Sequence, residues 1–143
     1  ETQAADRWLD GIVERWRRLR PHVPLATHID CGHPAPRLVA DATLEQALHN
    51  LINNAADASP DGVECEAALA GESLVVRILD RGPGLPEGYQ PGQPTPATGS
   101  GLGIGLLLAF GAVERCGGRI EFNPRPGGGT LATLTLPLSA LCP

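Results

Sequence analysis

The sequence contains no lysine, so all 11 of its basic residues are arginine. P-loop nucleotide-binding proteins and protein kinases each place a lysine on the phosphates, which excludes both classes. There is also no apolar run of the roughly 20 residues that a membrane-spanning helix needs. A formal net charge of −5 argues against a nucleic-acid partner. With 143 residues, 42% of them hydrophobic, the composition predicts one globular domain.

The cysteines form no C-x-x-C pair; they stand at Cys31, Cys65, Cys116 and Cys142. The Cys31-Gly32-His33 run has no second ligand pair at zinc-finger spacing, so we expect reduced, structural thiols and no thiol-bound metal. An initiator methionine and a signal peptide pattern are also absent, and the chain opens inside an amphipathic stretch. We therefore expect the sequence to be a piece of a longer protein.

The spacing of apolar residues predicts the helices and strands. Intervals of three and four indicate helices, and alternation indicates strands. The expected helices cover residues 3–20, 43–59 and 104–116, and the extended segments cover 23–30, 37–41, 63–70, 73–80, 119–123 and 130–138. Asp41 or Thr43 would cap the second helix. Helices and antiparallel strand pairs in this order favour an α+β fold, with helices layered on one face of a mixed sheet.

The helix expected at 43–59 has a polar stripe opposite its apolar side. At about 100° per residue, Asn50, Asn54 and Asp57 fall within roughly a 60° arc. Asparagine is a modest helix former, so its repetition at i and i+4 needs an explanation. Amide and carboxylate oxygens suit Mg²⁺, which takes one or two protein ligands and fills the rest from water and phosphate. The alternative is a plain solvent-facing side.

A second motif, Asp80-Arg81-Gly82-Pro83-Gly84, stands where an expected strand runs into a loop. An aspartate at a strand end can accept a hydrogen bond from an exocyclic amine. Nearby glycines allow the backbone to approach a flat ring closely. The same residues also suit an ordinary turn, so this motif alone leaves both readings open.

The third motif is the glycine-rich run Gly99–Gly105 immediately before a helix. Backbone N–H groups exposed by such a run, together with a helix N-terminus, suit a phosphate group. Ile104 and Leu106 break the G-x-G-x-x-G spacing of dinucleotide-binding folds. Thr98 breaks the G-x-S-x-G spacing of a serine nucleophile.

The fourth motif is Gly127-Gly128-Gly129-Thr130, which opens the last strand. A hairpin turn explains these residues fully. Only the presence of the other three motifs suggests a ligand role for Thr130.

In this order the four motifs resemble the N, G1, G2 and final glycine-threonine boxes of the GHKL superfamily. Within that superfamily they are most similar to the catalytic domains of two-component sensor histidine kinases. The N box covers residues 48–55, the G1 box 80–84 and the G2 box 99–104, so the match spans nearly the whole chain. The resemblance implies the Bergerat fold, a two-layer α/β sandwich with a mostly antiparallel sheet and about three helices on one face. The first helix and Pro60-Asp61-Gly62 are similar to the redox-responsive RegB-like (PrrB-like) kinases.

The resemblance implies ATP and Mg²⁺ as cofactors. Asn54 would ligate Mg²⁺, Asn50 would help to hold the metal-triphosphate region, and both would be catalytic. Asp80 would bind the adenine amino group, and the loop at 85–98 would be the ATP lid. The implied nucleotide-binding residues are Asn50, Asn54, Asp80, Gly82, Gly84, Gly99, Gly101, Leu102, Gly103 and Thr130.

Asn50 also bears on the reaction class. Superfamily ATPases place a glutamate at this position as general base, and an amide has no useful basicity. The γ-phosphoryl group would therefore be kept for a histidine on another domain. The four histidines, His22, His28, His33 and His49, lack the H-E/D-L-R-x-P context of that acceptor, and His49 is expected to be a packing or surface residue.

The resemblance also implies partners and a location. Residues 1–20 would lead in from an upstream dimerisation and phosphoacceptor domain, and residues 21–143 would form the catalytic domain. A response regulator would act through the upstream domain. The isolated domain would be a monomer, and the full protein a homodimer with this domain in the cytoplasm below a bacterial inner-membrane anchor.

The sequence departs from the family pattern at two places, and two alternatives to a kinase stay open. The F box is missing or reduced to Tyr89, which leaves a nucleotide-binding regulatory module without transfer activity as one alternative. The second alternative is a superfamily ATPase coupled to conformational change, although Asn50 argues against it. Asp57 stands where the family often has Lys or Arg, and its carboxylate would repel phosphate unless Mg²⁺ or a nearby arginine offsets it.

Overall fold

The computed structural model describes residues 2–39, 41–85 and 103–142. Its elements, in chain order, are β1 (Thr2–Ala4), α1 (Ala5–Leu19), β2 (Leu25–Asp30), β3 (Arg37–Val39), α2 (Ala42–Ala58), β4 (Val63–Ala70), β5 (Ser73–Asp80), α3 (Gly103–Arg115), β6 (Arg119–Pro124), β7 (Thr130–Pro137) and α4 (Leu138–Leu141). The predicted elements are present, with ends within a few residues of those expected.

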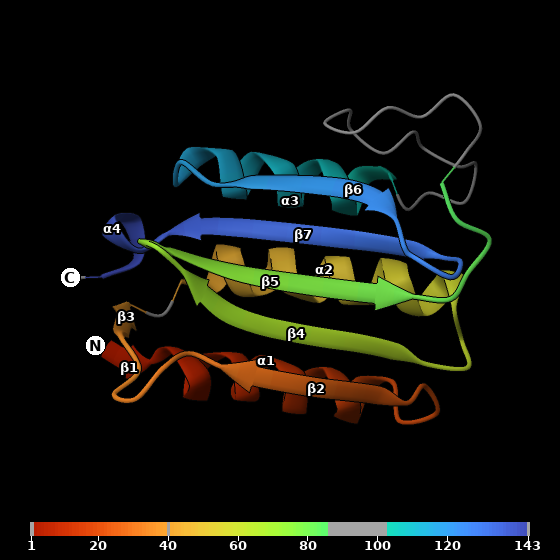
Figure 1. Ribbon diagram of the computed structural model, residues 1–143, viewed down its shortest axis with the longest axis horizontal. Coiled ribbons are helices and arrows are strands. Elements are labelled where there is room, and N and C mark those ends of the chain that lie inside the picture. The colour runs from red at the N-terminus through yellow and green to blue at the C-terminus, as the bar shows by residue number, and fades with distance from the viewer. Residues whose placement is uncertain (1, 40, 86–102, 143) are drawn as a thin grey trace.

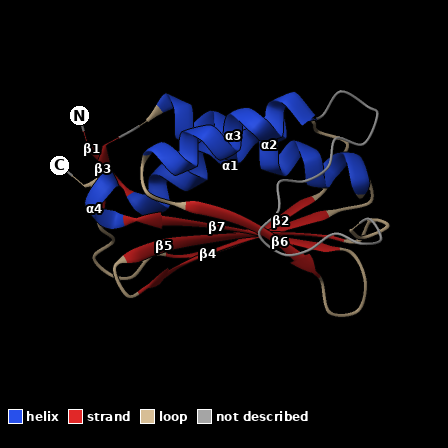
Figure 2. Cartoon of the chain, turned by 90° about the horizontal axis from the view of Figure 1, so that it is seen from above, coloured by secondary structure: helices blue, strands red, loops and turns tan. Residues whose placement is uncertain are grey.

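The main sheet has five strands in the order β2-β4-β5-β7-β6 (Figure 1). β2 pairs with β4 in parallel, and the other three pairings are antiparallel. The helices α1, α2 and α3 cover one face of the sheet (Figure 2). Figure 1 shows α2 between the other two. The predicted α+β fold with a mixed, mostly antiparallel sheet is therefore confirmed.

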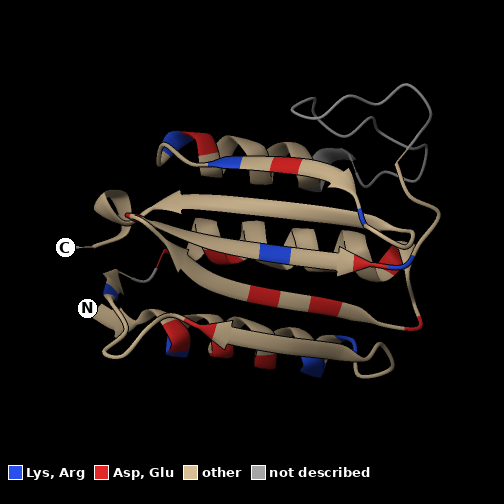
Figure 3. Cartoon of the chain, in the orientation of Figure 1, with Lys and Arg blue, Asp and Glu red and all other residues tan. Residues whose placement is uncertain are grey.

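The core lies between these helices and the sheet. α1 buries a stripe at helical spacing, which includes Trp8, Ile12 and Trp16. α2 buries Leu44, Leu48, Leu51, Ile52 and Ala55, the apolar side expected from the sequence. Alternate strand residues point into the same layer, as the two-residue period of a strand requires. Among the described residues, charges of both signs are interspersed along α1 and the strands (Figure 3).

The helix cap that the sequence left open is Asp41. Its Oδ1 accepts hydrogen bonds from the backbone N–H groups of Thr43 at 2.8 Å and Leu44 at 3.1 Å. These are two of the N–H groups that a helix leaves without an internal partner at its start. α2 consequently begins at Ala42.

Two short elements, β1 and α4, were not predicted, whereas β3 lies within the extended segment expected at 37–41. β1 and β3 pair with each other as a small separate sheet, and α4 follows β7. Residues 3 and 4, expected at the start of the first helix, belong instead to β1, which pairs with 37–39. The backbone N–H of Ala5 donates to the carbonyl of Pro36. β1 and α4, of three and four residues, are too short to show a clear periodicity, so the sequence pattern does not reveal them.

Candidate functional site

The polar arc of α2 carries the predicted metal and phosphate residues. Asn50 and Asn54 are half-buried, one turn apart, on the helix whose opposite side packs into the core. The amide of Gln46 donates to Oδ1 of Asn50 at 3.2 Å, which helps to orient that side chain. Neutral amide oxygens of this kind fit Mg²⁺ when phosphate supplies the charge. Groups of three or more His, Cys, Asp or Glu that could hold a metal by themselves do not occur in the described ranges.

Asp57, the third member of that arc, is paired with an arginine from α1. Nη1 of Arg20 lies 2.9 Å from Oδ1 of Asp57 and 3.4 Å from Oδ1 of Asn53. The indole N–H of the fully buried Trp16 donates to the same Asn53 oxygen at 2.8 Å. The sequence predictions missed these contacts of Asn53, Trp16 and Arg20. The available signal was Trp16 on the apolar side of α1, because a buried indole N–H usually finds an acceptor.

Asp80 lies at the end of β5 and is one of two buried polar residues in the described part of the chain, with 5% exposure. Its Oδ1 accepts from the backbone N–H of Gly82 at 2.9 Å and from that of Thr130 at 3.2 Å. Both bonds use one carboxylate oxygen. The other oxygen retains acceptor capacity, which an exocyclic amine can use.

Two glycines beside Asp80 allow unusually close backbone approaches. A Cβ added at Gly82 would lie 2.6 Å from the carbonyl oxygen of Ala58, in the last turn of α2. Gly129 has φ +104°, and a Cβ there would lie 2.0 Å from the carbonyl oxygen of Asp80. Such separations are below van der Waals contact, so only glycine fits both positions.

Ser59 joins the end of α2 to the end of β5. Its side chain is 5% exposed, and its Oγ donates to the carbonyl of Gly62 at 2.8 Å. The same Oγ accepts from the backbone N–H of Arg81 at 3.1 Å. The Asp80 loop is thus held directly against the helix that carries Asn50 and Asn54.

The hairpin turn between β6 and β7 is hydrogen-bonded to the end of β5. Nη1 of Arg81 donates to the carbonyl of Gly128 at 3.1 Å, and Nη1 of Arg125 donates to the carbonyl of Asp80 at 3.3 Å. Nη2 of Arg125 also binds Glu64 at 2.7 Å. Figure 1 shows the end of β5 and the start of β7 at the same edge of the sheet. Described residues of the second and fourth predicted motifs therefore meet there, and the end of α2 touches the second motif through Ala58 and Ser59.

The G2 box falls largely outside the described residues. Gly99, Gly101 and Leu102 lie there, as do Tyr89 and the predicted lid after Leu85. Gly103 is the first residue of α3. The predicted phosphate contacts of these glycines stay predictions, and so does the reduced F box.

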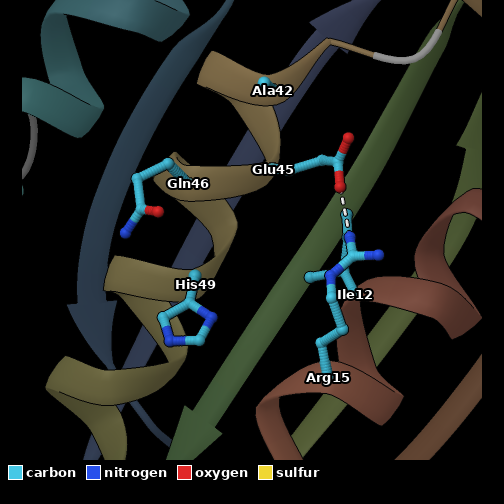
Figure 4. Close-up of a pocket in the computed structure, with 6 residues that line it drawn as sticks. All are labelled: Ile12, Arg15, Ala42, Glu45, Gln46 and His49. Carbon is cyan, nitrogen blue, oxygen red and sulfur yellow. Dashed lines mark hydrogen bonds and ion pairs between the residues drawn. The ribbon is translucent and has the colours of Figure 1, made fainter.

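A separate hollow of about 180 Å³ lies between α1 and the start of α2 (Figure 4). It is lined by Ile12, Arg15, Ala42, Glu45, Gln46 and His49. Arg15 and Glu45 form an ion pair across it. Burial, and then the charge of Arg15, lowers the pKa of the half-buried His49, which favours the neutral ring. This fits the packing or surface role expected for His49.

The four cysteines are free. Burial raises the pKa of both Cys31 and Cys65 to about 11. The thiolate is the reactive form and the metal ligand, so these two groups are held in the inert form. Structural thiols, as expected from the sequence, fit this environment. Within the described ranges, no helix has the length and hydropathy needed to cross a bilayer.

Comparisons with known proteins agree with this architecture. The family model described as histidine kinase-, DNA gyrase B-, and HSP90-like ATPase matches residues 40–140. The C4-dicarboxylate transport sensor protein DctS of Rhodobacter capsulatus is 35% identical over 113 residues, which are 72% of this chain and 17% of that protein. The chain thus spans about a sixth of the length of this curated relative.

Solved structures share the fold. The ATP-binding domain of PrrB from Mycobacterium tuberculosis has 24% identity and a TM-score of 0.72, and the match covers 95% of each chain. Full-length ShkA in complex with AMPPNP has 24% identity and a TM-score of 0.75, over 96% of this chain and 31% of that one.

Proposed function

The chain belongs to the histidine kinase-, DNA gyrase B-, and HSP90-like ATPase family, and on that premise we propose that it is the ATP-binding catalytic domain of a sensor histidine kinase. The sensor proteins among its relatives favour this branch of the family. The fold is also that of ShkA, a protein solved with an ATP analogue.

One observation carries the proposal. The buried carboxylate of Asp80 is fixed by two backbone donors, and its loop is packed against the end of α2, which carries Asn50 and Asn54. An acceptor for a base amine and oxygen ligands for a metal therefore lie on two elements that touch. Such an arrangement suits a molecule with a base at one end and charged phosphates at the other.

The residues divide the work of binding between them. Asp80 selects adenine by accepting a hydrogen bond from its amino group, and Gly82 and Gly84 shape the wall beside the ring. Asn54 ligates Mg²⁺, and Asn50 orients the metal-triphosphate region. Gly99, Gly101, Leu102 and Gly103 place the phosphates near the start of α3. Thr130 fixes the carboxylate of Asp80 through its backbone.

Asn50 directs the reaction toward transfer. Bound Mg²⁺–ATP supplies an activated γ-phosphoryl group, and the protein positions it and neutralises charge. An amide at residue 50 cannot take a proton from water, so hydrolysis is slow. The acceptor is a histidine on a separate dimerisation domain, from which a response regulator receives the phosphoryl group.

The wider setting follows from the same proposal. Residues 1–20 lead in from that dimerisation domain, which makes the whole protein a homodimer, whereas the isolated domain is a monomer. The domain lies on the cytoplasmic side of a membrane-anchored bacterial sensor. The narrower similarity to redox-responsive RegB-like kinases stays a prediction.

The first experiment is calorimetric titration of the domain with AMPPNP, with Mg²⁺ and then with EDTA. We expect saturable binding that Mg²⁺ strengthens; an absence of binding would remove the proposal. Incubation of the domain with ATP and the separate dimerisation hairpin should then yield phosphohistidine. Binding without transfer would favour a regulatory module, and steady hydrolysis that survives Asn50→Ala but is lost in Asn54→Ala would favour an ATPase.

A further inference from the structure

Arg20 reaches from the end of α1 to the polar arc of α2. Its Nη1 donates to Asp57 at 2.9 Å and to Asn53 at 3.4 Å. The guanidinium carbon lies 6.0 Å from the ring centroid of Trp16, whose indole N–H also binds Asn53. The arginine is therefore held in place by three side chains.

The helix geometry places this arginine beside the proposed phosphate end. At about 100° per residue, Asp57 is roughly 20° from Asn50 and roughly 60° from Asn54 around α2. Asp57 and Asn54 are also less than one turn apart along the helix. A group bound to Asp57 thus borders the residues proposed to hold the metal and the triphosphate.

The charge of Arg20 matters because Asp57 lies beside the proposed triphosphate site. A carboxylate at residue 57 would repel a bound triphosphate if it stood alone. Arg20 offsets that charge, and its guanidinium has five N–H donors in a fork that matches phosphate. Both bonds to α2 use Nη1, and 32% of the side chain is exposed, which leaves donor capacity for a ligand oxygen.

Two arginines within α1 are engaged elsewhere. Arg15 pairs with Glu45 in the first turn of α2, far along the helix from Asp57. Arg17 binds Glu14 and the carbonyl of Leu25. Arg20 is the one of these three that borders the polar arc.

We propose that Arg20 is a nucleotide-binding residue, which supplies from α1 the cation that contacts the terminal phosphates. Asp57 and Asn53 aim its guanidinium. This inference rests on the proposed function and adds a residue to its site. It also makes the seating of α1 on α2, through Trp16 and Asn53, a determinant of triphosphate affinity.

Calorimetry with AMPPNP and with adenosine, both with Mg²⁺, tests the proposal on four proteins: the unaltered domain, Arg20→Ala, Arg15→Ala and Asp57→Asn. Arg20→Ala should weaken AMPPNP about tenfold or more and leave adenosine unchanged, because a charge-assisted contact to phosphate is lost. Arg15→Ala breaks a comparable α1–α2 ion pair at the other end of α2 and should change neither affinity. Asp57→Asn should strengthen AMPPNP binding about threefold, because it removes a negative charge but keeps an acceptor for Arg20.

The signs of these effects separate a ligand contact from a structural one. If Arg20→Ala and Arg15→Ala lower the melting temperature alike and both retain AMPPNP affinity, Arg20 only joins two helices and the proposal is wrong. A loss of affinity in Asp57→Asn would also contradict it. If the unaltered domain binds AMPPNP and loses it on Asn54→Ala, the proposed function stands whatever Arg20 does. If the unaltered domain does not bind AMPPNP, both proposals fail.

Discussion

The backbone N–H of Thr130 donates to Oδ1 of Asp80 at 3.2 Å, although 50 positions separate the two residues in the sequence. This bond joins the start of β7 to the end of β5, where the backbone N–H of Gly82 binds the same oxygen. The proposed adenine acceptor is thereby fixed by main-chain groups from two sides.

Replacement of that acceptor should alter base selection. Asp80→Asn exchanges one carboxylate oxygen for an amide nitrogen, which cannot accept a hydrogen bond from the adenine amino group. We expect AMPPNP affinity to fall about 10- to 100-fold, from the loss of about 1.5–3 kcal/mol. The GTP analogue GMPPNP should lose less in parallel titrations, and an unchanged ratio of the two affinities would contradict the adenine contact.

Removal of the proposed metal ligand should remove the effect of Mg²⁺. For Asn54→Ala we expect AMPPNP to bind at least about tenfold more weakly with Mg²⁺ present. With EDTA the variant and the unaltered domain should bind alike, because the amide acts through the ion. A variant that still gains affinity on addition of Mg²⁺ would place the metal elsewhere.

Gly129 is predicted to tolerate no side chain. Gly129→Ala puts a Cβ 2.0 Å from the carbonyl oxygen of Asp80 at φ +104°, so we expect a loss of unfolding free energy of about 2–4 kcal/mol. Gly11 in α1 is the matched control, because a Cβ there meets nothing within 4 Å. Gly11→Ala should stabilise the domain by about 0.5–1 kcal/mol. Urea denaturation of both variants checks the two opposite signs, and equal shifts would refute the close approach.

The cap of α2 can be tested by a pair of neighbouring alanines. Asp41→Ala removes the acceptor for two N–H groups at the helix start and should cost about 1 kcal/mol of unfolding free energy. Thr43→Ala lies one residue inside the helix and should change stability by less than about 0.5 kcal/mol. A lower urea midpoint for Thr43→Ala than for Asp41→Ala would show that Thr43, and not Asp41, caps the helix.

Alkaline pH should destabilise the domain through Cys65. Burial raises the pKa of this thiol from 9.0 to about 11, so above pH 9 the unfolded chain loses its proton first. The folded state then binds more protons than the unfolded state, and the free energy of unfolding falls as pH rises from about 9 to 11. Cys65→Ala should reduce this slope in urea titrations at several pH values. An identical slope would show that the thiol ionises equally in both states.

Local signals determined most of the predicted fold. The alternation over 63–70 and 73–80 gave the bounds of β4 and β5, because alternate residues of each strand are buried in the core. Asp41 as a cap also follows from local chemistry. The segment at 37–41 was expected to be extended, but its pairing with β1 could not be predicted, since a three-residue strand at 2–4 is defined only by its partner.

In the candidate site, too, local patterns predicted some features, and contacts between distant residues were not predictable from them. The two-faced pattern of α2 predicted that Asn50 and Asn54 would share a polar side. The contact of Arg20 with Asp57 joins residues 37 positions apart and depends on how α1 packs, which periodicity does not describe. The meeting of Asp80 and Thr130 was implied by the resemblance alone, because no local pattern links residues on two distant strands.

Both hydrogen bonds to Asp80 Oδ1 come from backbone N–H groups, and this determines which substitutions the proposed adenine site can tolerate. Every residue except proline supplies an N–H, so the identity of the side chain at position 130 is irrelevant to this particular bond. Base selection could therefore persist in descendants of this sequence that have drifted widely at that position, with proline as the one substitution barred by loss of the donor.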